Sequence, residues 1–135
     1  MEAKVTWVED RRFVGEAGSG HAIVVDGSAE KRGPSPMELV LMGMVGCTAY
    51  DVVSILEKKR QAVAGVEVSA RAERALEPPQ VFTEIEVEYR VRGRNISPKA
   101  VEDAIHLSEE KYCSASIMLG KTARITTSYR IEEEG

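Results

Sequence analysis

The stretch Ser35-Pro36-Met37-Glu38-Leu39-Val40-Leu41 opens the segment that decides the fold. Its serine suits the N-cap of a helix, its first proline the first helical position, and its glutamate completes a capping box. No proline interrupts residues 37–61, and polar residues become frequent only after Ile55. We therefore predict one long helix from residue 36 to about Gln61. Because its first half is apolar nearly all round, we expect a buried central helix.

Two glycines, Gly43 and Gly46, precede Cys47 inside this helix. Each costs about 1 kcal/mol relative to alanine in a helix interior. Their close spacing indicates that another backbone or a ligand approaches the helix at this point.

Alternating apolar and polar residues predict strands before and after the long helix, with a second, amphipathic helix between the last two. The order favours an α+β fold with antiparallel sheets, in a single domain over residues 1–135. The long helix carries more apolar surface than one small sheet can cover, so we expect a homodimer. The predicted strands are residues 3–8, 21–26, 66–74, 83–92 and 123–131, and Ser97-Pro98 caps the second helix.

Composition narrows the classes of function. The chain has 135 residues, a formal net charge of −4 and scattered basic residues, which argues against nucleic acid as a partner. No secretory signal is visible at the N-terminus, and the longest apolar stretch, residues 39–50, is shorter than a membrane span. We therefore expect a cytoplasmic protein with no membrane partner.

The two cysteines, Cys47 and Cys113, are the strongest candidates for chemistry. Cytosolic cysteines more often serve catalytic or redox-sensing roles than form a permanent bridge. The alternative is that both are inert, buried hydrophobes. Cys113 follows a predicted break between helical segments, where free N–H groups favour a thiolate. Two thiols suffice to reduce a peroxide and then close a disulfide, although the sequence does not say whether the sulfurs meet.

A metal site is the competing use of these cysteines. The chain offers only Cys47, Cys113, His21 and His106 as soft ligands, without the close-spaced pairs typical of structural zinc. We therefore expect neither a metal nor a cofactor, and we interpret His106 as an exposed helix residue. Asp51 lies one turn after Cys47 on the same helical face, and its carboxylate would raise the pKa of a neighbouring thiol.

Groups that could assist Cys47 are less clearly marked. Arg11 and Arg12 have an ordinary interpretation as strand-end residues, yet a guanidinium is well suited to stabilise a thiolate. Glu38 is explained by its capping box, and helical geometry places it on the opposite side of the helix from Cys47. It could still face a site completed by a second subunit.

The blocks Ser35-Pro36-Met37-Glu38-Leu39, Gly46-Cys47-Thr48 and Glu110-Lys111-Tyr112-Cys113-Ser114 resemble the OsmC/Ohr family (osmotically inducible protein C and organic hydroperoxide resistance protein) over nearly the whole chain. The resemblance is to a branch with the Pro-Met-Glu-Leu pattern and Gly20-His21 before a strand.

The resemblance implies an OsmC-like fold that forms an intertwined homodimer and reduces organic hydroperoxides at the subunit interface. Cys47 matches the peroxidatic cysteine and Cys113 the resolving one, with a dithiol as reductant. The best-studied branch has a catalytic glutamate directly after the proline, where Met37 stands here, so Glu38 is the candidate. Its catalytic arginine corresponds approximately to Arg12 or to Arg11, and His21 is a further candidate for activating Cys47. A redox-sensing or small hydrophobic ligand-binding dimer without enzymatic activity is the second hypothesis.

Overall fold

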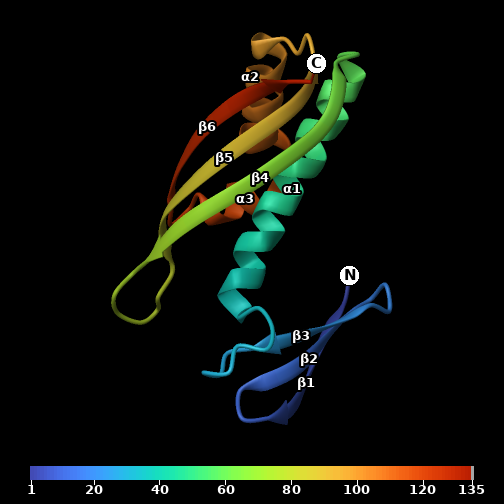
Figure 1. Ribbon diagram of the computed structural model, residues 1–135. Coiled ribbons are helices and arrows are strands. Elements are labelled where there is room, and N and C mark those ends of the chain that lie inside the picture. The colour runs from blue at the N-terminus through green and yellow to red at the C-terminus, as the bar shows by residue number, and fades with distance from the viewer. Residues whose placement is uncertain (135) are drawn as a thin grey trace. The chain divides into compact units, whose positions relative to one another are not determined.

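The computed structural model describes residues 1–134 and divides the chain into two compact units, Met1–Met42 and Gly43 onward (Figure 1). Two three-stranded sheets and a long helix confirm the predicted α+β class. Each unit contains one of the sheets.

The first unit is an antiparallel sheet of β1 (Ala3–Glu9), β2 (Arg12–Ala17) and β3 (Ala22–Asp26), in that order. The central strand β2 is absent from the predicted strands, because its short sequence Arg-Phe-Val-Gly-Glu-Ala hides the alternation. Every residue of β1 is exposed, and Trp7 keeps 64% of its surface accessible. This strand therefore buries no side chain, and Val25 of β3 is the buried apolar residue of the sheet.

The long helix α1 runs from Pro36 to Lys58 and begins with the predicted capping box. The amide of Ser35 donates to Glu38 Oε1 at 2.9 Å, and the amide of Glu38 donates to Ser35 Oγ at 3.2 Å. The helix ends three residues before Gln61, because Arg60 adopts a left-handed backbone conformation (φ 58°).

The predicted burial of α1 is wrong for the single chain. Its buried residues, Met44, Thr48, Val52 and Leu56, follow one another at every fourth position and form a single stripe. Val40, Met42 and Tyr50 are exposed, with Tyr50 at 74%. By length and composition alone α1 could cross a membrane (mean hydropathy 1.9), but the core helix of a soluble protein passes the same test.

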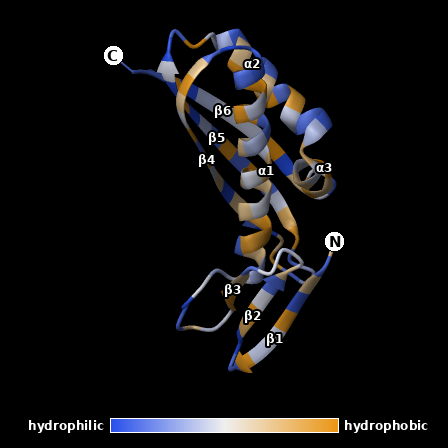
Figure 2. Ribbon diagram, turned by 90° about the vertical axis from the view of Figure 1, so that its right-hand side faces the viewer, coloured by the Kyte–Doolittle hydropathy of each residue, from blue (hydrophilic) through white to orange (hydrophobic). Residues whose placement is uncertain are grey.

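Among the described residues, no other segment packs closely against the two glycines of α1. A Cβ built on Gly43 or Gly46 would meet nothing within 4 Å, so the close approach that their spacing predicts is not made here. Figure 2 shows that the first half of the helix is largely apolar, and Val40 and Met42 on it are exposed.

The second sheet contains β4 (Ala62–Arg74), β5 (Phe82–Arg94) and β6 (Arg124–Glu133). The β4–β5 pair is antiparallel as predicted, but β6 runs parallel to β5, which corrects the expected antiparallel sheet. The reason is the connection: α2 (Pro98–Leu107), a π-helical turn η1 (Ser108–Tyr112) and α3 (Ser114–Leu119) carry the chain back before β6 starts. Such a crossover makes the strands parallel.

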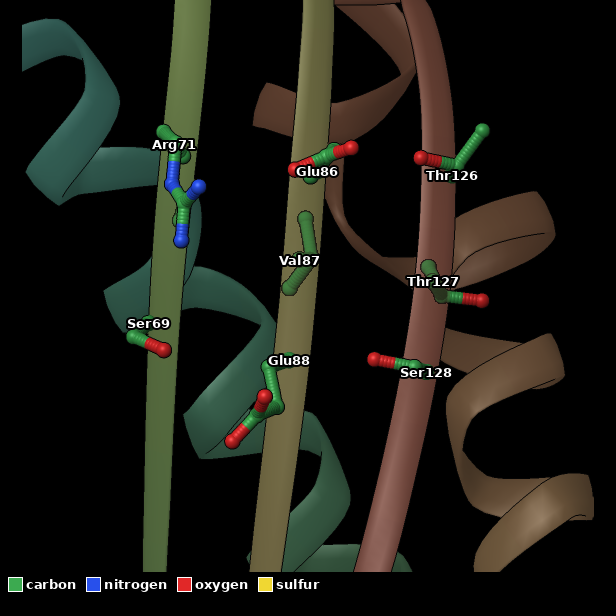
Figure 3. Close-up of a pocket in the computed structure, with 9 residues that line it drawn as sticks. Ser69, Arg71, Glu86, Val87, Glu88, Thr126, Thr127 and Ser128 are labelled. Carbon is green, nitrogen blue, oxygen red and sulfur yellow. The ribbon is translucent and has the colours of Figure 1, made fainter.

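The second unit has a true core. The predicted inward residues of β5 (Ile85, Val87, Tyr89 and Val91) are at most 2% exposed, under α1 and α2, which cover one face of the sheet (Figure 2). The opposite face is polar. A shallow hollow of about 430 Å³ lies there, with no thiol among its lining residues. Figure 3 shows side chains that line it, such as Arg71, Glu86 and Ser128.

Candidate functional site

The second unit brings together the two cysteines that the sequence singled out. Cys47 comes from α1 and Cys113 from the junction between η1 and α3, and both are free thiols. Their sulfur atoms and a carboxylate oxygen of Asp51 all lie within 4.8 Å of one another. Three reactive side chains from two elements therefore share one site.

Helix α1 supplies two of these groups through its periodicity. Cys47 and Asp51 are four residues apart, so their side chains lie one above the other on the same face. The neighbouring stripe of Thr48 and Val52 is fully buried, which fixes the rotation of the helix about its axis. Cys47 and Asp51 flank that stripe and are half-buried.

A change of helical geometry positions Cys113. After α2, the chain widens into the π-helical turn, and the amide of Cys113 donates to the Ser108 carbonyl at 2.7 Å. Cys113 then turns extended (φ −79°, ψ 101°) and becomes the N-cap of α3. The predicted break between helical segments is confirmed, and π-helical turns are frequent at functional sites.

The surroundings of Cys113 favour the neutral thiol. Burial, followed by hydrogen bonding with Cys47, raises the pKa of Cys113. Two donors from Ser116, its amide at 3.3 Å and its hydroxyl at 3.1 Å from Sγ, act in the opposite direction but do not prevail. The expected thiolate-favouring N–H group is present, and desolvation outweighs it.

Asp51 lies beside both sulfurs and also lines a surface groove. Its Oδ2 accepts a hydrogen bond from the buried Ser108 hydroxyl at 2.9 Å. Asp51 also lines a groove of about 510 Å³, together with Tyr50, Ile55 and Tyr112. A small molecule in this groove would meet the carboxylate beside the thiols. Among residues 43–134, no basic side chain is hydrogen-bonded or ion-paired to this carboxylate or to either sulfur.

Sequence reasoning missed the roles of the two serines. Ser108 is visible in the sequence as the one polar residue on the apolar face of the second helix, and in the structure this hydroxyl holds Asp51. Ser116 gives no such signal, because its contact with Cys113 depends on the turn into α3.

A buried tyrosine, Tyr89, is paired with the half-buried Glu109 in the same unit. Tyr89 donates its hydroxyl to Glu109 Oε1 at 2.9 Å. Burial, aided by the charge of Glu109, raises the pKa of Tyr89, so its hydroxyl stays protonated. Burial also raises the pKa of Glu109.

Arg12, the predicted activator of Cys47, is engaged by carboxylates within the first unit. Its Nε lies 3.3 Å from Asp26 Oδ2, its Nη1 2.6 Å from Glu9 Oε1 and its Nη2 2.8 Å from Glu30 Oε2. The hydrogen bond to Asp26 chiefly raises the pKa of the Arg12 guanidinium. All three nitrogens therefore have a structural partner.

The other predicted residues have local partners as well. Glu38 is the capping residue of α1, and the Ser35 backbone amide chiefly lowers its pKa. Arg11 donates to the Asp10 carbonyl at 2.9 Å, and His21 Nδ1 lies 3.0 Å from Ser19 Oγ. His106 is exposed, as expected, and pairs with Glu110.

The chain is similar to known proteins in sequence and in fold. Residues 27–128 match the family model described as OsmC-like protein. Protein YhfA of Escherichia coli K12 is 50% identical over 131 residues, 97% of this chain and 98% of YhfA. A hypothetical protein from Aquifex aeolicus VF5 is 30% identical, with a TM-score of 0.89 over 99% of this chain and 97% of that one. OhrB of Bacillus subtilis, an organic hydroperoxide resistance protein, shares the fold alone: 16% identity, TM-score 0.63, over 96% and 98% of the two chains.

Proposed function

This chain belongs to the OsmC-like protein family, and from that premise we propose that it reduces organic hydroperoxides with Cys47 and Cys113. The observation that carries the proposal is the proximity of the two sulfurs, which lie within 4.8 Å although they come from different elements. The fold is shared with a hydroperoxide resistance protein.

The reaction has three balanced steps. The Cys47 thiolate attacks the terminal oxygen of the hydroperoxide; an S–O bond forms, the O–O bond breaks, and the leaving alkoxide takes up the proton that the thiol released and departs as the alcohol. Cys113 then attacks the sulfur of the sulfenic acid, water leaves, and the Cys47–Cys113 disulfide forms. A dithiol reductant restores both thiols by exchange and is itself oxidised to a disulfide. We place this cycle in the cytoplasm, where such reductants are available.

The two thiols have unequal environments, which supports unequal roles. Cys47 is half-buried, whereas Cys113 is fully buried and its pKa is raised by burial. Of the two cysteines, Cys47 is therefore the one that we expect a dissolved hydroperoxide to reach. Cys113 is protected from direct oxidation and lies close enough to trap the sulfenic acid, although the final S–S distance of about 2 Å requires further approach.

We also propose that the chain acts as a homodimer. The apolar side chains of β1 and the open face of α1 have no cover within their own units, and Trp7 and Tyr50 remain 64% and 74% exposed. Exposed apolar surface of this extent is typical of association sites. A second copy of this chain would supply matching apolar surface.

An assay with tert-butyl or cumene hydroperoxide and a dithiol tests the enzyme. We expect Cys47→Ser to lose roughly a thousandfold or more of the activity, since the nucleophile is gone. Cys113→Ser should still consume one equivalent of hydroperoxide, since its Cys47 forms a sulfenic acid, but it should form no internal disulfide. Ser114→Ala, an exposed neighbour of Cys113, serves as the matched control. Unchanged activity in Cys47→Ser would reject the assignment.

Arg12 and Glu38 remain candidates for assisting Cys47, and substitution tests them separately from their structural roles. If Arg12 stabilises the thiolate, Arg12→Lys should lower the rate of Cys47 oxidation while the sheet of the first unit stays folded. Glu38→Gln keeps an oxygen for the capping bond to Ser35 and removes only the charge. A rate equal to wild type in this variant would leave Glu38 as a helix cap alone.

A further inference from the structure

The same cluster has the composition of a soft-metal site. Cys47 and Cys113 are free, and a carboxylate oxygen of Asp51 and both sulfurs lie within 4.8 Å of one another. We propose that the reduced thiol pair binds one thiophilic divalent cation, of which Zn²⁺ is the type, with Asp51 as the third ligand. This inference uses the thiols of the proposed peroxidase but none of its chemistry.

The three ligand atoms would need to move only slightly closer together to bind zinc. Zinc binds thiolate sulfur at about 2.3 Å and carboxylate oxygen at about 2.0–2.2 Å in a tetrahedron, so its ligand atoms stand roughly 3.5–3.8 Å apart. The three atoms here are within 4.8 Å before any metal is present. Cys47 and Asp51 are one turn apart on α1, and Cys113, at the junction of η1 and α3, supplies the third ligand atom.

Outer contacts hold two of the three ligands in place. The Ser108 hydroxyl donates to Asp51 Oδ2 at 2.9 Å, which leaves the other carboxylate oxygen for a metal. The Ser116 amide and hydroxyl point at Cys113 Sγ, 3.3 and 3.1 Å away, and would stabilise a thiolate there. Hydrogen bonds of this kind orient metal ligands and commonly contribute 10–100-fold in affinity.

The chemistry of binding is balanced without a redox step. Two thiols lose their protons, and two thiolates and one carboxylate bind the dication, which leaves a fourth position for water. Because Cys47 and Asp51 are half-buried and Asp51 lines the groove, water can reach that position. A disulfide offers no thiolate, so metal binding and oxidation exclude each other. A bound metal would therefore protect the thiols from hydroperoxide.

Cobalt titration tests the site, because Co²⁺ replaces Zn²⁺ and reports its ligands by absorption. The full-length, reduced protein is titrated anaerobically. We expect saturation at one equivalent, a thiolate-to-cobalt charge-transfer band, tetrahedral visible bands, and displacement by Zn²⁺. Protein oxidised to the disulfide should show none of these. Absence of the band in reduced protein would overturn the proposal.

Variants assign the ligands. Cys47→Ser should abolish the charge-transfer band, and Asp51→Asn should weaken binding at least tenfold. Asp103→Asn is the matched control, because Asp103 pairs only with exposed lysines. Asp51→Cys keeps a ligand at this position and should raise the charge-transfer intensity by about half, which guards against misfolding of Asp51→Asn. Binding equal to wild type in Asp51→Asn, with no rise in Asp51→Cys, would remove Asp51 from the site.

A protection experiment separates this inference from the peroxidase proposal. Zinc-loaded protein should form the disulfide at least tenfold more slowly with one equivalent of hydroperoxide than metal-free protein, and a chelator should restore the rate. If metal-free protein shows no oxidation but cobalt still binds, the peroxidase proposal fails and the metal site stands. Oxidation at equal rates with and without zinc would overturn the protective role.

Discussion

The two units of the chain are stabilised by different interactions. Residues from Gly43 onward bury apolar side chains such as Leu56 and Val91 completely. The sheet of residues 1–42 buries Asp26 beside Arg12, while Trp7 and other apolar side chains of β1 stay exposed. The thiol site therefore lies beside a buried apolar core, whereas the first unit has a polar anchor and leaves the apolar side chains of β1 exposed.

The largest expected effect on stability comes from the apolar core of the second unit. Leu56→Ala should lower the free energy of unfolding by about 2–5 kcal/mol, because Leu56 is fully buried and truncation leaves a cavity. Urea unfolding measures this loss, which should not depend on protein concentration. Leu76→Ala, at a 94% exposed position, is the control and should change stability little. Equal losses in the two variants would contradict a core in this unit.

Substitutions on the exposed surface of β1 should change self-association rather than the stability of the single chain. We expect Trp7→Ser to weaken self-association by at least tenfold, because a homodimer would bury this side chain. Sedimentation at several concentrations measures the change, with Thr6→Ala on the other face of the strand as control. A concentration-independent loss of stability in Trp7→Ser would instead show that its own chain covers the indole.

The polar anchor of the first unit should give acid sensitivity. The Ser28 side chain first, then the Arg32 amide, Ser28 amide and Arg12, hold the pKa of Asp26 well below its usual range, although burial opposes them. The anchor therefore contributes stability above pH about 4, which is lost as the pH falls through the folded-state pKa. We expect faster amide exchange in β2 and β3 of Asp26→Asn at pH 7, and a smaller effect in Glu9→Gln. Unchanged exchange in Asp26→Asn would refute the anchor.

The smallest expected effect is a gain in stability at neutral pH, and it comes from a residue of the second unit. Burial raises the pKa of Glu109, so its protonated form favours folding and this contribution falls as the pH rises from about 4.5 through the folded-state pKa. We therefore expect Glu109→Gln to be slightly more stable than wild type at pH 7 and to lose that advantage near pH 4. Thermal unfolding at both pH values measures it, with exposed Glu57→Gln as control. An advantage that persists at pH 4 would reject this explanation.

Local patterns in the sequence predict the local structure well. Alternation identifies the inward residues of β5, the capping box marks the start of α1, and the break before Cys113 is visible. Alternation does not encode strand direction, so it misses the parallel pairing of β6. Periodicity also does not say what covers an apolar helix, so it wrongly predicts that α1 is buried within one chain.

The sequence identifies individual residues of the site but does not show that Cys113 lies next to Cys47. Both cysteines and the shared face of Cys47 and Asp51 follow from the sequence. The approach of Cys113 depends on the crossover and on the π-helical turn, which no short-range pattern specifies. The same turn places Ser108 against Asp51, so the outer contacts of the site emerged only with the structure.

The most direct test of the thiol site is one equivalent of cumene hydroperoxide added to the reduced, metal-free protein, followed by thiol titration and mass spectrometry. We predict the loss of two hydrogen atoms from the intact chain and a single peptide pair joined by a Cys47–Cys113 disulfide. Two thiols that remain titratable, or oxidation of Cys47 alone beyond the sulfenic acid without a disulfide, would contradict the proposed cycle.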